Sequence, residues 1–215
     1  MLKNKMGFFS SLRWKVAFTY LLVIGIGFVA ANISIIKVFE IRNVNEKQER
    51  FRAYAIQVAQ AISDDYASDD VNMKADIIYD IEEMGKEISY QEGRQPTRIL
   101  VLDKNGTVEF DSYNDHSPNG FIRRNLARES PIIKRVLAGE DVVPTALYID
   151  APSGEQKWVM YAYAPITHER YGIIGMVILS TSLSDVDEML NTISYMLNRY
   201  LLIILAGVAI ISFLI

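Results

Sequence analysis

Two arginines and three tyrosines are the side chains of this sequence best suited to hold a small ligand. Arg123 and Arg124 lie in an expected loop. Tyr161 and Tyr163 alternate along one expected strand, and Tyr148 is expected across from them on the neighbouring strand. A guanidinium clamps a carboxylate through two parallel hydrogen bonds, and tyrosine hydroxyls add donors. These residues are therefore candidates for binding a carboxylate. The preferred interpretation is structural: arginines at a solvated helix start and tyrosines as core aromatics whose hydroxyls reach water.

An acidic stretch offers a different chemistry. Asp64, Asp65, Asp69 and Asp70 supply oxygen ligands that suit Ca²⁺ or Mg²⁺ bridged to anionic lipid. The spacing does not match an EF-hand, and a loop that links two helices is normally polar. The preferred interpretation is a solvated acidic loop, so no metal site is expected. The absence of cysteine also excludes metal sites built on thiolate.

The two histidines do not form a catalytic arrangement. His116 lies in an expected loop, and His168 lies in an expected turn between two strands. The sequence contains no nucleophile elbow, no recognisable triad and no glycine-rich phosphate loop. We therefore expect no catalytic residue and no cofactor in these 215 residues.

Two apolar runs define the expected domain organisation. Residues 16–36 contain no charge, and as a helix they would extend roughly 31 Å, enough to cross about 30 Å of hydrocarbon. A signal peptide is the alternative, but its apolar region is usually about 7–15 residues long. We expect a cytoplasmic tail over 1–15, a transmembrane helix over 16–36, a polar domain over 37–198, and an apparently truncated second transmembrane helix over 199–215.

The charge distribution predicts the orientation in the membrane. Lys3, Lys5, Arg13 and Lys15 give the tail a charge of +4, whereas the stretch from Lys37 to Arg199 holds 18 basic and 26 acidic residues, or 18 − 26 = −8. Basic flanks stay on the cytoplasmic side. The charges thus predict a multi-pass membrane protein with the domain 37–198 outside, and the absence of cysteine in an exported domain of this size favours a bacterial plasma membrane. The acidic balance also argues against nucleic acid as a partner.

A heptad pattern marks the helix that follows the first apolar run. Apolar residues recur at 3-4 spacing, with one polar member, which is typical of a coiled-coil seam. One interpretation is a seam between two copies in a parallel homodimer. The other is a helix that packs on the sheet of its own domain, and the two are compatible if one edge of the stripe faces the sheet. The seam residues are Ile41, Val44, Gln48, Phe51, Ala55, Val58 and Ile62.

The rest of the domain alternates short helices with strands. Asp70 or Asn72 would cap a second helix that ends near Tyr90, and Asn105-Gly106 predicts a tight hairpin. Together the elements predict an α+β fold: one five-stranded antiparallel sheet with long N-terminal helices, flanked by two transmembrane helices. The further expected elements are strands 98–102 and 107–111, a helix 131–138, strands 142–151, 156–165 and 173–181 (the last one central), and an exit helix from Ser184.

The order of these elements resembles the extracytoplasmic PAS-like (single-cache) sensor domain of bacterial membrane-bound sensor histidine kinases. The likeness covers essentially the whole chain. Each motif is structurally generic, so the specificity comes from their order and from the flanking spans. The motifs are the hairpin 99–108 with Phe110-Asp111-Ser112, the helix 130–139 that ends in glycine, Tyr161-Ala162-Tyr163-Ala164-Pro165-Ile166, Gly172-Ile173-Ile174-Gly175-Met176-Val177, and Ser11-Leu12-Arg13-Trp14-Lys15 before the span.

The resemblance implies the sensing and transmembrane portion of a two-component sensor histidine kinase. A stimulus detected outside would move the second transmembrane helix and control a cytoplasmic kinase that is missing here. ATP, Mg²⁺ and a response regulator would belong to that missing part, because neither His116 nor His168 lies in a phosphoacceptor helix. The alternatives are the same input module in a chemoreceptor or cyclic-dinucleotide enzyme, and a stand-alone membrane-anchored binding protein.

Overall fold

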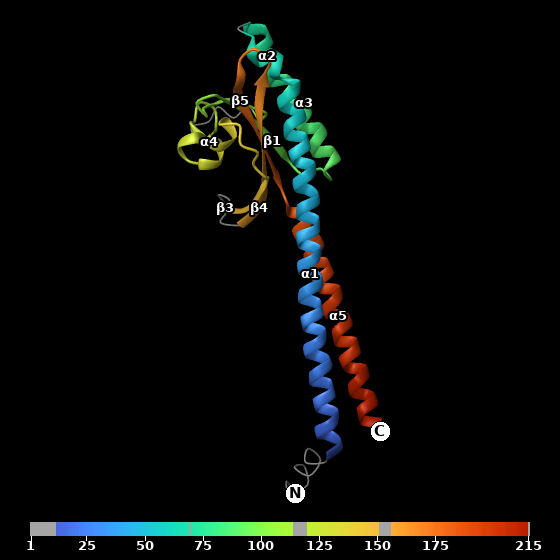
Figure 1. Cartoon of the computed structure of the whole chain (residues 1–215). Coiled ribbons are helices and arrows are strands. Elements are labelled where there is room, and N and C mark those ends of the chain that lie inside the picture. Colours follow the sequence, from blue (N-terminus) through green and yellow to red (C-terminus); the bar gives the residue numbers. More distant parts are fainter. Residues whose placement is uncertain (1–11, 69, 114–119, 151–155, 215) are drawn as a thin grey trace. The chain divides into compact units, whose positions relative to one another are not determined.

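The computed structural model of the chain describes residues 12–68, 70–113, 120–150 and 156–214. It divides into two compact units, residues 1–42 with 188–215, and residues 43–187 (Figure 1). Parts of the sequence predictions lie outside the described residues, namely most of the cytoplasmic tail, Asp69, His116 and the connection between the predicted strands 142–151 and 156–165.

The first unit is made from parts of two long helices. Helix α1 (Leu12–Ala61) and helix α5 (Ser184–Leu214) are each long and apolar enough to cross a membrane. Large apolar side chains of this unit, such as Phe18, Ile26 and Leu202, are mostly exposed in the isolated chain. An exposed apolar surface of this kind needs lipid or another protein to cover it.

The second unit is built on one antiparallel sheet with the strand order β2-β1-β5-β4-β3. The predicted α+β PAS-like fold is confirmed, and β5 is central as its continuous apolar run indicated. The strands are β1 (Thr97–Asp103), β2 (Val108–Asp111), β3 (Thr145–Asp150), β4 (Gln156–His168) and β5 (Gly172–Ser182).

One face of this sheet is covered by α1 and by α3 (Val71–Gln91), as Figure 1 shows. Side chains alternate between the faces along a strand, so Trp158, Met160 and Ala162 of β4 share this face and are all buried. As predicted, the Asp70 side chain caps α3 by accepting a hydrogen bond from the Asn72 backbone N–H at 2.8 Å. The expected acidic loop is not a loop throughout, because residues 63–67 form the short helix α2 (Ser63–Ala67).

The predicted dimer seam needs correction at this point. Phe51, Ala55, Val58 and Ile62 are 0–2% exposed within a single chain. Side chains that already fill the core of their own domain cannot also face a second copy. The heptad pattern over these four residues therefore reflects packing on the sheet. Gln48, half-buried, donates a hydrogen bond to the Pro144 carbonyl at 2.9 Å, so it too is used within the chain.

The other face of the sheet carries α4 (Pro131–Leu137) and the short 3₁₀ helix η1 (Leu126–Arg128). Their apolar residues pack with Leu100 and Leu102 of β1 and with Met176 and Ile178 of β5 in one cluster. Tyr161 and Tyr163 lie at the border of this cluster, half-buried.

Two glycines make the β1–β2 connection and the centre of the sheet possible. Gly106 has φ of +79° in the predicted hairpin, and a Cβ there would collide with Ala127. At Gly175 in β5 a Cβ would collide with the carbonyl oxygen of Leu102. These close approaches place η1 against the β1–β2 turn and β5 against β1.

Candidate functional site

The polar residues of the α4 face form a row across the sheet. Arg98 of β1 pairs with Ser180 of β5, Ser180 pairs with Tyr161 of β4, and Tyr161 pairs with Thr145 of β3. Directly paired residues project to the same face of an antiparallel sheet. Tyr163 lies on this face as well, and its hydroxyl is 3.3 Å from Thr145 Oγ1. The row therefore places a guanidinium and several hydroxyls beside the apolar cluster under α4.

Arg98 is the charged residue of this row, and it was not among the predicted site residues. Its Nε donates to Asp111 Oδ1 at 2.9 Å and its Nη2 donates to Oδ2, which makes a bidentate pair. The guanidinium lies 5.0 Å from the centroid of the Tyr113 ring and 4.7 Å from that of Phe121. Cations are attracted to aromatic faces at such distances. The sequence feature that could have identified Arg98 is its charge, because it shares a strand face with Leu100 and Leu102 in the otherwise apolar segment RILVL.

Asp111 is held from several directions. Its carboxylate is fully buried, and Oδ1 also accepts a hydrogen bond from the Tyr113 backbone N–H at 3.1 Å. The next residue, Ser112, accepts a hydrogen bond from the Ile99 N–H through its hydroxyl at 2.9 Å. This end of β2 thus fixes both the acceptor of Arg98 and the backbone of β1.

Burial keeps the tyrosines of this face in their neutral form. It raises the pKa of Tyr113, Tyr161 and Tyr163, while the nearby Arg98 charge partly opposes the rise at Tyr113 and Tyr161. A neutral tyrosine hydroxyl can donate a hydrogen bond to an anion. The arrangement is therefore suited to bind a small polar molecule.

The five residues predicted to bind a ligand do not all meet. Arg123 and Arg124 are exposed, and Arg124 forms a bidentate pair with Glu129 at 2.8 and 2.7 Å. The Arg124–Glu129 pair raises the pKa of Arg124 and lowers that of Glu129. The structure brings only Tyr161 and Tyr163 together on the polar row.

Tyr148 lies on the opposite face of the sheet from these two tyrosines. It pairs with Trp158, and their rings stack with centroids 5.5 Å apart. The expected position across from Tyr161 is wrong by three residues in register, because Thr145 occupies it and Tyr148 pairs with Trp158. Tyr148 is also 59% exposed.

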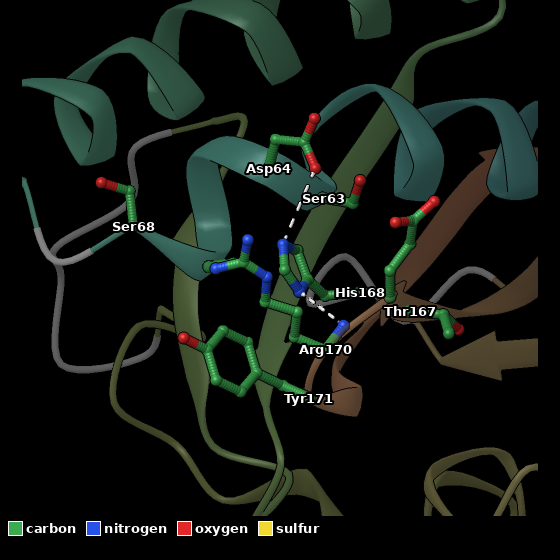
Figure 2. Close-up of a pocket in the computed structure, with 9 residues that line it drawn as sticks. Ser63, Asp64, Ser68, Thr167, His168, Arg170 and Tyr171 are labelled. Atoms are coloured by element: carbon green, nitrogen blue, oxygen red, sulfur yellow. Dashed lines mark hydrogen bonds and ion pairs between the residues drawn. The ribbon is translucent and has the colours of Figure 1, made fainter.

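A hollow of about 640 Å³ lies between α2 and the turn from β4 to β5 (Figure 2). Its walls are polar and carry both signs of charge, with Asp64 and Glu169 against Arg170. The Arg170 backbone N–H donates a hydrogen bond to Nδ1 of His168 at 3.2 Å. The His168 ring stacks on the ring of Tyr171. Its Nε2 is 4.0 Å from Asp64, whose side chain is 94% exposed, so this contact is weak. The lining residues are Ser63, Asp64, Ala67, Ser68, Thr167, His168, Glu169, Arg170 and Tyr171.

The acidic stretch and the histidine do not combine into a metal site in the described residues. No group of three or more His, Asp or Glu side chains there is placed to hold a metal ion. Asp64 and Asp65 belong to α2, and Asp70 caps α3.

Comparisons with known proteins identify the fold. No protein-family model matches the sequence, and no curated protein matches it significantly. Among solved structures, the ligand-binding domain of the Campylobacter jejuni chemoreceptor Tlp3, in complex with L-valine, aligns at 13% identity with a TM-score of 0.50, over 80% of this chain and 65% of that one. The periplasmic domain of Vibrio cholerae LuxQ aligns at 13% identity and a TM-score of 0.47, over 77% and 70%.

The ligand-binding domain of the Pseudomonas aeruginosa amino acid chemoreceptor PctC, in complex with GABA, aligns at 18% identity and a TM-score of 0.44, over 73% of this chain and 66% of that one. The Tlp3 alignment spans less than two thirds of that domain. The predicted resemblance to extracytoplasmic PAS-like sensor domains is confirmed at the level of the fold.

Proposed function

We propose that this chain is the sensing and transmembrane portion of a bacterial signalling receptor. Residues 43–187 would lie outside the plasma membrane and respond to a small molecule, and α5 would carry the response inward. The observation that carries this proposal is the PAS-like sheet whose last strand, β5, leads after Leu183 directly into α5, a helix with a candidate membrane span. The basic tail before the first span supports a cytoplasmic N-terminus.

The polar row on the α4 face is the proposed ligand site. Tyr161 and Tyr163 supply neutral hydroxyl donors, the Arg98–Asp111 pair supplies fixed polar groups of both charges, and the neighbouring cluster supplies apolar surface. These groups suit a small carboxylate such as an amino acid, and the Tlp3 domain of the same fold was solved with L-valine. Binding would shift the domain between two packings only by the difference in affinity for them.

A sensor histidine kinase is the proposed whole protein. Its kinase domain, with ATP and Mg²⁺, and its response regulator would lie beyond these residues. A chemoreceptor or a cyclic-dinucleotide enzyme would use the same input module, and a fold does not distinguish their outputs. The gene sequence past the codon for Ile215 separates these outputs: a histidine-bearing helical domain with an ATP site supports the kinase, and any other output domain or a stop contradicts it.

The parallel homodimer stays a prediction. Ile41 is half exposed and Val44 is partly exposed, so these two residues of the predicted seam remain accessible to a second copy in the isolated chain.

The ligand site is tested by thermal unfolding of the complete chain in detergent. The probes are the proteinogenic amino acids, GABA and C4 dicarboxylates, each added to the native chain and to Tyr161→Phe and Tyr163→Phe. We expect at least one probe to raise the melting temperature of the native chain and to lose most of that effect in one or both variants. Tyr148→Phe is the matched control, because Tyr148 lies on the other face. A shift that survives both variants, or no shift with any probe, would contradict the site.

A further inference from the structure

Four charged side chains meet where α1, the end of α3 and the first turn of α5 come together in residues 43–187. They are Lys47 and Arg50 of α1, Glu92 at the C-cap of α3, and Asp185 of α5. Two positive and two negative charges make the group neutral. Their position matters because Asp185 is the second residue of α5, the helix proposed to carry the signal.

Lys47 is the central member of the group. Its ammonium donates to both carboxylate oxygens of Asp185, at 2.9 and 2.7 Å. The Lys47 side chain is only 6% exposed, whereas that of Asp185 is 37% exposed. Asp185 also lies in the first turn of α5, where a negative charge interacts favourably with the helix dipole. The pair therefore connects a buried residue of α1 to a partly solvated residue of α5.

A second carboxylate lies beside the same ammonium. Glu92 Oε2 is 4.0 Å from Lys47 Nζ, and the Glu92 side chain is 4% exposed. Arg50 holds Glu92 in place through a bidentate pair at 2.8 and 3.1 Å, and the Tyr54 hydroxyl lies 3.5 Å from Glu92 Oε1. A movement of Nζ by about 1 Å would bring it within hydrogen-bond distance of Glu92.

We propose that Lys47 is an exchangeable ionic latch that positions the start of α5. In one state Lys47 binds Asp185, as in this structure. In the other it binds Glu92, and the first turn of α5 is released from α1. This inference rests on the proposed function, because it names the contact through which a change in the sensor domain reaches α5. Lys47 is a positioning residue and does not contact the proposed ligand.

The second carboxylate makes this exchange possible. Separating a buried ion pair is normally very unfavourable because one charge is left without a partner. Here Lys47 keeps a carboxylate partner in both states, and the released Asp185 is already partly in water. Other contacts at the start of α5 are not ionic: Leu183 and Val186 are buried, the Leu183 N–H donates to the Trp158 carbonyl at 2.8 Å, and the Ser184 hydroxyl donates to Gln95 Oε1 at 2.8 Å. Apolar packing keeps the start of α5 near the sheet, and the carboxylate that Lys47 binds determines which of the two proposed arrangements this turn adopts.

The test is amide hydrogen exchange of the complete chain in lipid nanodiscs. The reporter is the first turn of α5, including the Asp187 amide, which donates to the Leu183 carbonyl at 3.0 Å. Asp185→Asn removes the observed partner of Lys47, and we expect exchange of this turn to become about tenfold faster, as for loss of a charge-assisted hydrogen-bonded pair at a partly exposed site. Lys47→Met removes the cation and should also make exchange of this turn faster. Lys47→Arg keeps a cation that can bind Asp185 and should restore most of the protection.

Glu92→Gln gives the result that separates a latch from a merely structural pair. It removes the competing carboxylate, so we expect the first turn of α5 to exchange no faster than in the native chain. Lys86→Met, which breaks the exposed pair with Glu82 on α3, is the matched control and should change nothing in α5. Amides of the central strand β5 serve as the reference for global unfolding.

Two outcomes would overturn the latch. One is faster exchange of the α5 start in Glu92→Gln to the same extent as in Asp185→Asn. The other is an effect of Asp185→Asn no larger than that of Lys86→Met. Both readouts need no ligand, so failure of the ligand screen would leave this result intact. Conversely, a chain that binds a ligand but shows no latch would retain the proposed sensing function and lose only this inference.

Discussion

Breaking the Arg98–Asp111 pair should have an asymmetric effect on the stability of residues 43–187. Arg98→Met leaves the carboxylate of Asp111 fully buried without its counter-charge, with the hydrogen bond from the Tyr113 N–H still in place. It also removes the guanidinium from the rings of Tyr113 and Phe121. Loss of one member of a buried ion pair lowers the free energy of unfolding by about 3–5 kcal/mol. We expect about 4 kcal/mol for Arg98→Met.

The reverse change should be milder. Asp111→Asn keeps a side-chain oxygen that can accept from the Tyr113 N–H and from Arg98. The guanidinium, which loses its counter-charge in this variant, is 19% exposed and can reach water. We expect a loss of about 2 kcal/mol. In the double variant Arg98→Met/Asp111→Leu no charge is left buried, so much of the loss should be recovered.

Urea unfolding of the complete chain in detergent measures these differences. The sequence has two tryptophans, so a Trp14→Phe background leaves Trp158, which is buried in the second unit, as the fluorescent reporter. With a slope of about 2 kcal/mol per M, the midpoint should fall by about 2 M for Arg98→Met and about 1 M for Asp111→Asn. Equal midpoints in the two single variants, or a double variant less stable than Arg98→Met, would refute the argument that the uncompensated carboxylate dominates.

Three further predictions use the same assay. Phe51→Ala should lower the free energy of unfolding by about 3–5 kcal/mol because Phe51 is fully buried, whereas Ile41→Ala should leave it nearly unchanged; comparable losses would restore the seam interpretation. Gly175→Ala should destabilise by about 1–3 kcal/mol because its Cβ meets the Leu102 carbonyl, and an unchanged midpoint would show that β1 and β5 can separate there freely. Burial and the hydrogen bond with Glu109 raise the pKa of Tyr66, so the folded state keeps a proton that the unfolded state loses above about pH 10. Stability from this group is present below that pH and falls as the pH rises further, so Tyr66→Phe should show a shallower fall, and parallel curves for the two chains would count against it.

Local sequence patterns predicted most elements because each has a local physical cause. Asn105-Gly106 supports the hairpin through a positive φ at Gly106, and Asp70 starts α3 through its own side chain. The long apolar run 173–178 indicated a strand covered on both faces, and β5 is central. In each case the residues that predict the element lie within the element or next to it in the sequence.

Predicting the candidate site required knowing which residues meet across neighbouring strands, and local sequence patterns do not determine those contacts. The register between β3 and β4 differs by three residues from the expected one, and any odd shift places a side chain on the other face of the sheet, so Tyr148 lies away from Tyr161. A heptad stripe at 51–62 serves equally for packing on a sheet and for a coiled coil, so spacing alone could not decide between them. Arg98 was recognisable as a charge inside an apolar strand, but its partner lies on another strand.

The two charge clusters of residues 43–187 differ in how many arrangements they allow. Arg98 has one buried carboxylate and two aromatic faces around it, so each of these contacts favours the same position of the guanidinium. Lys47 has two carboxylates within 4.0 Å, one on α3 and one on α5, so its ammonium has two positions in which it remains paired. Apolar burial has little directionality and favours a single compact packing. A change of partner by a buried cation is directional, and in this fold it occurs where the last strand has just ended and α5 has begun. The cluster at Arg98 is therefore suited to hold a site rigid, and the cluster at Lys47 is suited to move.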